Sequence, residues 1–172
     1  MEALLKASDF DVSKFPRVEL LTGESPKAAA AGTAIAELLE KTLAVTVRVR
    51  SMKWPAYFKA VAAGDFQMSL GGWTGDYFDP AAFLEGWTKE GGGGSTGWSE
   101  EGFDALMGEA SGTADAKGRL GLLAKAEALL LAAAPVVPLH TASDVHLFRE
   151  GVGGLRPNLL SRFPLKHVRM MK

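Results

Sequence analysis

The sequence contains no cysteine, carries almost no net charge and has no long uninterrupted apolar run. Without cysteine, neither disulfides nor thiolate metal sites can form within the chain. A formal net charge of −1, with no dense run of lysine or arginine, gives no bulk attraction to nucleic acid or to anionic membranes. The longest apolar candidate, residues 120–139, is interrupted by Lys125, Glu127, Pro135 and Pro138. We therefore expect no nucleic-acid partner and no membrane-spanning segment in this chain.

Recognisable catalytic and metal-binding patterns are also missing. There is no Gly-x-Ser-x-Gly turn, and His140, His146 and His167 are too widely spaced to make a ligand pair on one helix. The glycine run 91–94 is not followed by the lysine of a phosphate-binding loop. It is read as a surface loop or, alternatively, as an engineered spacer. We expect no cofactor, no metal and no enzymatic reaction; a small stand-alone α/β hydrolase or transferase with an unrecognised site is the alternative.

What the chain does contain is typical of one ordinary globular domain. It has 172 residues, of which 47% are hydrophobic and 23% charged, so it can bury a real core. The first residues lack the basic head and long apolar centre of a secretion signal. We therefore expect either a protein that stays inside the cell or a chain whose natural beginning is missing.

The first part of the chain alternates between strand and helix patterns. Residues 17–21 form a short strand candidate, and Ser25-Pro26 is a typical start for the amphipathic helix that follows. Residues 45–49 and 66–70 alternate apolar and polar side chains as strands do, and a short helix ending at Gly64 lies between them. This order favours βαβ units with a parallel sheet flanked by helices.

The second part is predicted to be mainly helical, with strands near its end. Asp79 is expected to be the N-cap of a short helix that continues to Trp87. Ser99 is expected to cap a helix over 100–110, and Asp115 to open a longer helix that Pro135 ends. Residues 136–139 and 145–148 are predicted strands, and Ala3–Ala7 is predicted to be the tail of a helix.

The segment from Gly72 to Pro80 is the best candidate for a binding site. Glycine allows the backbone to approach a ligand, and an acid beside aromatic rings can hold a cation. Asp76, with Trp73 and Tyr77 beside it, therefore predicts a place where a positively charged group is bound. The alternatives are that Asp76 caps a turn and that Trp73 and Trp98 belong to the core.

A series of motifs, in this order and spacing, resembles the carboxy-terminal part of the extracellular solute-binding proteins of family 5. These are the oligopeptide-, dipeptide- and nickel-type binding proteins of ABC importers. The resemblance runs from about Ala3 to the end of the chain. Its main motifs are Trp54-Pro55-Ala56-Tyr57, Gly72-Trp73-Thr74-Gly75-Asp76-Tyr77 with Asp79-Pro80, Thr96-Gly97-Trp98-Ser99 and Phe103-Asp104-Ala105-Leu106.

The resemblance implies a fold and a position within a larger protein. The expected fold class is α/β: one lobe of a periplasmic-binding-protein-like clamshell, with a central, mostly parallel sheet flanked by helices and C-terminal strands that return toward the hinge. Residues 1–172 would be a single domain, the ligand-binding lobe of a longer two-lobed protein whose export signal is not in this chain. An isolated lobe would expose its cleft face and hinge strands, so it could dimerise.

The resemblance also implies a function. The protein would capture a ligand, most simply a peptide, and deliver it to an ABC permease from the periplasm or the cell surface. Asp76 would hold the α-amino group of the peptide, while Trp73, Thr74 and Gly75 would line the same pocket. Tyr77 and Trp98 are expected as further walls of that pocket.

Overall fold

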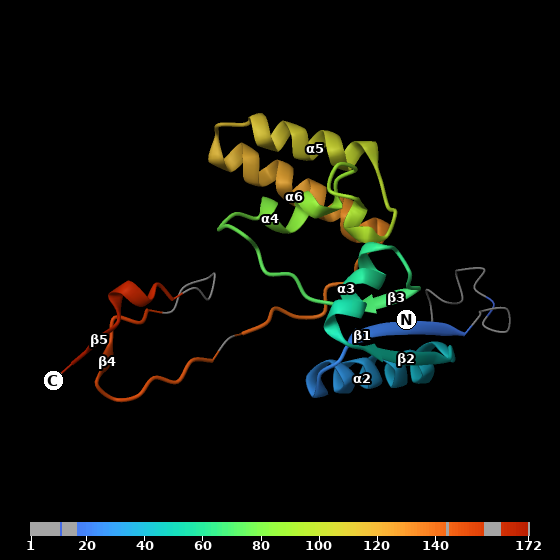
Figure 1. Ribbon diagram of the computed structural model, residues 1–172. Coiled ribbons are helices and arrows are strands. Elements are labelled where there is room, and N and C mark those ends of the chain that lie inside the picture. Colours follow the sequence, from blue (N-terminus) through green and yellow to red (C-terminus); the bar gives the residue numbers. More distant parts are fainter. Residues whose placement is uncertain (1–10, 12–16, 144, 157–162, 172) are drawn as a thin grey trace. The chain divides into compact units, whose positions relative to one another are not determined.

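The computed structural model describes residue 11 and residues 17–143, 145–156 and 163–171 (Figure 1). The chain divides into two compact units, one ending at Gly72 and the other beginning at Trp73. The single domain expected over residues 1–172 stays a prediction.

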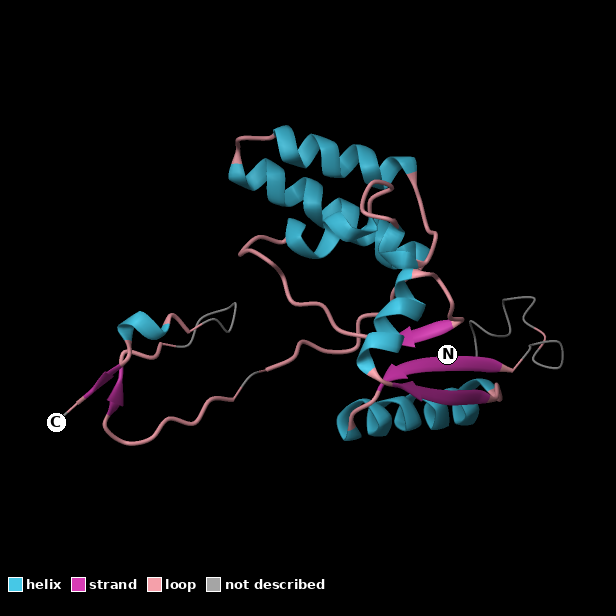
Figure 2. Cartoon of the chain, in the orientation of Figure 1, coloured by secondary structure: helices cyan, strands magenta, loops and turns pink. Residues whose placement is uncertain are grey.

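The first unit is a small parallel sheet with one helix on each face (Figure 2). Its elements are β1 (Val18–Gly23), α2 (Pro26–Leu43), β2 (Val47–Met52), α3 (Trp54–Ala62) and β3 (Met68–Leu70). Both β2 and β3 pair in parallel with β1, which gives the strand order β2-β1-β3. The expected strand–helix alternation and parallel sheet are confirmed.

Contacts from β1 show why the two helices cover opposite faces. Neighbouring residues of a strand point to opposite sides of the sheet. Leu21 packs with Tyr57 and Ala60 of α3, whereas a side chain added at Gly32 of α2 would touch Thr22. The crossover from β1 to β2 and the crossover from β2 past β1 to β3 run in opposite directions across the sheet, and right-handed crossovers of this kind place their helices on opposite faces.

Local sequence signals fix the ends of α2. The hydroxyl of Ser25 accepts a hydrogen bond from the amide of Ala28 at 3.1 Å, and Pro26 occupies the first turn. At the other end Ala44 adopts a left-handed conformation with φ 56° and donates its amide to the carbonyl of Glu40. The predicted helix start is therefore confirmed in detail.

The second unit is a helical cluster. It contains α4 (Ala81–Leu84), the 3-10 turns η2 (Glu85–Trp87) and η3 (Gly93–Ser95), α5 (Glu101–Gly112) and α6 (Ala116–Ala133). Asp115 caps α6 as expected, accepting the amide of Gly118 at 2.6 Å. Ser99 does not cap α5: Glu100 is the N-cap residue and makes no side-chain cap bond.

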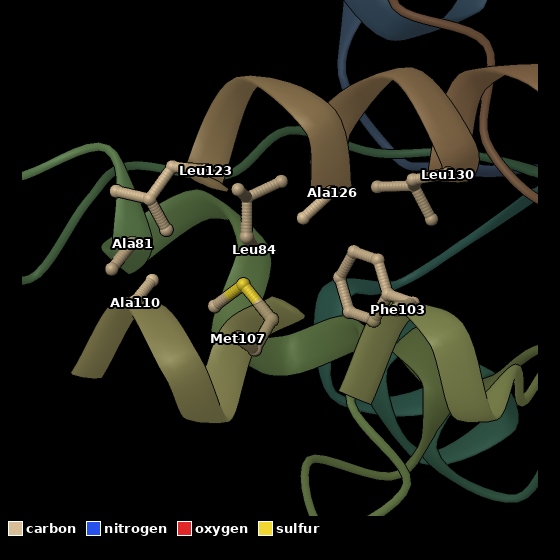
Figure 3. Close-up of a cluster of buried hydrophobic side chains, with 8 residues drawn as sticks. All are labelled: Ala81, Leu84, Phe103, Met107, Ala110, Leu123, Ala126 and Leu130. Carbon is tan, nitrogen blue, oxygen red and sulfur yellow. The ribbon is translucent and has the colours of Figure 1, made fainter. Parts of the chain in front are cut away.

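Side chains from three helices meet in the core of this unit (Figure 3). Phe103 is 0% exposed, and the half-buried ring of Trp87 packs against the cluster. On α6 the side chains of Leu123, Ala126 and Leu130 form one buried stripe, whereas Ala133 at the end of the helix is exposed. The buried cluster consists of Ala81, Leu84, Phe103, Met107, Ala110, Leu123, Ala126 and Leu130.

The predicted strands at 136–139 and 145–148 are wrong. Residue 144 lies outside the described ranges, and the described residues of these segments join no strand ladder. Val145 and Leu147 are 84% and 93% exposed, so their alternating pattern has no sheet to pack on. A short antiparallel pair forms further on, between β4 (Val152–Gly153) and β5 (Arg169–Met170). Ala3–Ala7 lies outside the described residues.

Candidate ligand-binding site

The predicted binding segment is a loop whose alternate residues are attached to the helix that follows it. We call residues 73–79 the 73–79 loop; it begins the second unit and precedes α4. The indole nitrogen of Trp73 donates to the carbonyl of Ala82 at 3.1 Å. Gly75 is buried, and a Cβ added to it would lie 3.2 Å from the ring of Phe83. These two contacts hold the first half of the loop against α4.

Asp79 secures the far end of the loop. Its Oδ1 accepts the amide of Ala81 at 2.8 Å, but the N-cap residue of α4 is Pro80, so the predicted N-cap position is wrong by one residue. Both carboxylate oxygens also accept hydrogen bonds from the guanidinium of Arg119 on α6, at 2.7 and 2.9 Å. This arginine and the Ala81 amide lower the pKa of Asp79 below its ordinary value of 3.8.

Tyr77 is attached to the same helical segment. Its hydroxyl forms a hydrogen bond with Glu85, and this bond, together with desolvation and nearby negative charge, raises the pKa of Tyr77 to about 12. The proton therefore stays on the phenol, whose side chain is 42% exposed. With Trp73, Gly75 and Asp79, Tyr77 completes an alternating set of attached residues.

Trp73 and Tyr77 are 67% and 42% exposed despite their contacts, and within the described ranges the residues between the attached ones have no such contacts. Thr74, Asp76 and Phe78 are all exposed, Phe78 to 76%. Among the described residues none of the three has a hydrogen-bond or ion-pair partner. The Asp76 carboxylate is thus held on a constrained loop with its oxygens open, as the acceptor of an ammonium group needs to be. In the described part of the chain, no hydrogen bond supports the alternative that Asp76 caps a turn.

Trp98 has a different environment from the other predicted ligand walls. It is half-buried at the edge of the helical core, where its ring meets Phe103 edge-on at 5.2 Å. Its ring contact is therefore with the core and not with Trp73 or Tyr77. This packing favours the core alternative, and a ligand role for Trp98 stays a prediction.

The glycine run is a folded loop. The amide of Gly93 donates to the carbonyl of Thr88 at 3.1 Å, and the amide of Lys89 donates to Asp104 at 3.1 Å. Any side chain at Gly94 would overlap the ring of Trp87. Such close packing favours a natural loop over an engineered spacer.

Two features of this site were not found by sequence reasoning. Phe78 lies two residues after Asp76 in the same aromatic-rich segment, and this neighbourhood is the sequence signal that could have identified it. Arg119 lies 40 residues after Asp79 in a helix, and no local signal connects the two.

In the described ranges, no group of three or more His, Asp or Glu side chains could hold a metal ion. None of the helices within those ranges is sufficiently long and apolar to traverse a lipid bilayer.

Comparison with known proteins places this chain in a family. The profile of the bacterial extracellular solute-binding proteins, family 5 Middle, matches residues 2–95, which is more than half of the chain. The chain belongs to this family. The resemblance expected from the motifs is confirmed, and membership in a family of solute-binding proteins supports a non-catalytic role. The alternative of a stand-alone hydrolase or transferase is not supported.

Individual family members show the same relationship. The dipeptide-binding protein DppE of Bacillus subtilis is 33% identical over 143 residues, covering 83% of this chain and 26% of DppE. The oligopeptide-binding protein OppA of the same organism is 31% identical over 153 residues, covering 88% of this chain and 27% of OppA. The chain thus spans about a quarter of the length of these curated relatives.

A solved structure confirms the fold. The murein tripeptide binding protein MppA of Escherichia coli superposes with a TM-score of 0.89 and 24% identity, over 99% of this chain and 34% of MppA. At this identity the likeness establishes the fold alone. The α/β class and the periplasmic-binding-protein-like architecture expected from the sequence are confirmed.

Proposed function

We propose that this chain is one lobe of a two-lobed protein that captures peptides for an ABC importer. The named relatives are dipeptide- and oligopeptide-binding proteins, which supports a peptide as the ligand. Their family is extracellular, which supports a location in the periplasm or on the cell surface. The partner that receives the ligand would be a membrane permease.

The observation that carries the proposal is the open carboxylate of Asp76 within a loop that is attached at every second residue. The amino terminus of a peptide is an ammonium group, and a carboxylate accepts its hydrogen bonds with the help of opposite charge. In water such a pair is weak, because solvent screens it. Closure of a second lobe over the ligand would remove that water and strengthen the pair.

Asp76→Asn tests the anchor in the two-lobed protein that contains this lobe. Asparagine keeps the shape but removes the charge, so we expect affinity for a free-amine peptide to fall at least about tenfold, or ~1.4 kcal/mol. Asp65→Asn is the matched control, since Asp65 is an exposed acid in the loop between α3 and β3 of the first unit. Isothermal calorimetry measures both variants.

A second version of this test changes the amino terminus of the peptide. A peptide whose amino terminus is acetylated has no ammonium group, so it should bind the wild type more weakly than the free peptide does. Against Asp76→Asn the two peptides should bind nearly equally, because the group that tells them apart is gone. Unchanged affinity of Asp76→Asn for the free peptide would refute the anchor.

A further inference from the structure

We propose that Arg119 is a positioning residue for the Asp76 carboxylate. It touches Asp79, three residues further along the same loop, and would act on the ligand only through the loop. The expected effect of Arg119 on binding rests on the proposed function. Its effect on the position of the 73–79 loop can be tested without any ligand.

The geometry of the contact fixes direction as well as distance. Two guanidinium nitrogens donate to two carboxylate oxygens of Asp79, at 2.7 and 2.9 Å. A paired arrangement of this kind holds the planes of both groups, which a single bond does not do. The orientation of Asp79 therefore follows the orientation of Arg119.

The position of Arg119 is fixed by the packing of α6. It lies one turn before Leu123 on α6, and residues four apart share a helix face. Leu123 is buried in the helical core together with Ala126 and Leu130. The loop end that carries Asp79 is thereby connected to the longest helix of the second unit.

The other attachments of the 73–79 loop are more local. Trp73, Gly75 and Tyr77 contact Ala82, Phe83 and Glu85, all of which lie within six residues of Asp79. Within the described ranges, the Arg119 pair is the polar link from this loop to α6. Without it the loop would depend on these local contacts and on the bond from the Ala81 amide to Asp79, which hold it less firmly, and Asp79 would lose the paired contact that orients the segment carrying Asp76.

The pair is suited to positioning more than to stability. Both side chains are partly exposed, at 28% and 27%, and exposed ion pairs contribute little to folding. Removing the pair should therefore change where the loop lies while leaving the fold in place. This difference separates a positioning role from a merely structural one.

The first test uses the 172-residue chain and no ligand. We expect Arg119→Gln to shift the amide resonance of Asp76 and to speed hydrogen exchange at the Trp73 indole, which bonds Ala82. Arg119→Lys keeps the charge but not the paired geometry, so it should restore the wild-type signals only in part. Arg50→Gln, which breaks the similarly exposed Glu19–Arg50 pair in the first unit, is the matched control and should leave both signals unchanged.

Unchanged Asp76 and Trp73 signals in Arg119→Gln would overturn the inference. Equal changes in Arg119→Gln and Arg50→Gln would also overturn it, because they would indicate a general loosening. If Arg119→Gln does not fold, Arg119→Lys carries the test, and wild-type signals in that variant would contradict the need for paired geometry.

The second test is a double-mutant cycle on peptide affinity in the two-lobed protein. We expect Arg119→Gln to weaken binding by about twofold to tenfold when Asp76 is present, and to have no further effect in the Asp76→Asn background. Equal losses in both backgrounds would overturn positioning, since Arg119 would then act independently of Asp76. Wild-type peptide affinity of Asp76→Asn would refute the proposed anchor instead, and the ligand-free test would still decide the role of Arg119.

Discussion

Substitution of single glycines in the 91–94 run distinguishes a folded loop from a spacer. Gly94 has φ 61°, in the left-handed region, and a Cβ there would overlap the ring of Trp87. Gly92 has φ 84°, also left-handed, but a Cβ there would meet nothing within 4 Å. Gly94→Ala therefore adds backbone strain and a steric clash, whereas its matched control Gly92→Ala adds the strain alone.

The expected magnitudes follow from these two terms. A left-handed conformation costs an alanine roughly 1–2 kcal/mol, and the loss of glycine entropy from the unfolded chain offsets about 0.4–1 kcal/mol of this. Forcing a methyl group into packed side chains costs typically about 1–3 kcal/mol more. We expect Gly92→Ala to lose about 1 kcal/mol of unfolding free energy and Gly94→Ala about 2–4 kcal/mol.

Urea unfolding followed by far-ultraviolet circular dichroism measures both values. This signal is preferred to fluorescence because Trp87 lies at the site of the substitution. The slope with urea should be the same in both variants if only stability changes. In a flexible spacer neither glycine would be constrained, and both substitutions would be neutral or slightly stabilising. That result, or equal losses in the two variants, would refute the packing argument.

Two further predictions concern groups with unusual environments. The hydrogen bond to Glu85 is the largest cause that raises the pKa of Tyr77 to about 12, so in a Tyr57→Phe background Glu85→Gln should bring it back toward the ordinary 10.0, as followed by tyrosinate absorbance. Because the folded pKa is the raised one, this contribution to stability is complete below pH 10 and is lost as pH rises toward 12; an unchanged titration would contradict the assigned bond. Thr22 is 0% exposed, and in the described part of the chain its hydroxyl has no hydrogen-bond partner. Thr22→Val should therefore raise the unfolding free energy by about 1 kcal/mol in urea titrations, and a loss of stability would instead reveal a partner for the hydroxyl.

The first unit could be predicted from the sequence because its signals are local. Ser25-Pro26 specifies the start of α2, and the alternation over 45–49 predicts a strand close to β2. Strand–helix alternation then leaves few topologies to choose from. The same alternation over 145–148 failed, because a strand also needs a partner to pair with, and the pattern alone does not say whether one is present.

The candidate site could be predicted only in part. Composition identified Asp76 and its aromatic neighbours, since an acid among rings and glycines is unusual wherever it lies. Which residues are attached and which are open depends on contacts with Ala82, Glu85 and Arg119, and the loop has no regular periodicity to reveal it. The Asp79–Arg119 pair joins residues 40 positions apart, so only the packing of α4 against α6 brings it about.

The arrangement of the 73–79 loop explains how an exposed acid could serve as a selective anchor. An exposed ion pair contributes at most about 1 kcal/mol, so Asp76 alone would hold an ammonium group weakly. A loop attached at every second residue has, however, already given up most of its conformational freedom during folding. Less ordering then remains to oppose ligand binding, because the backbone that carries the carboxylate is placed before a ligand arrives. The remaining requirement is exclusion of water, which a second lobe closing over the ligand would supply, so the proposed mechanism needs a rigid carboxylate on one side and a movable cover on the other.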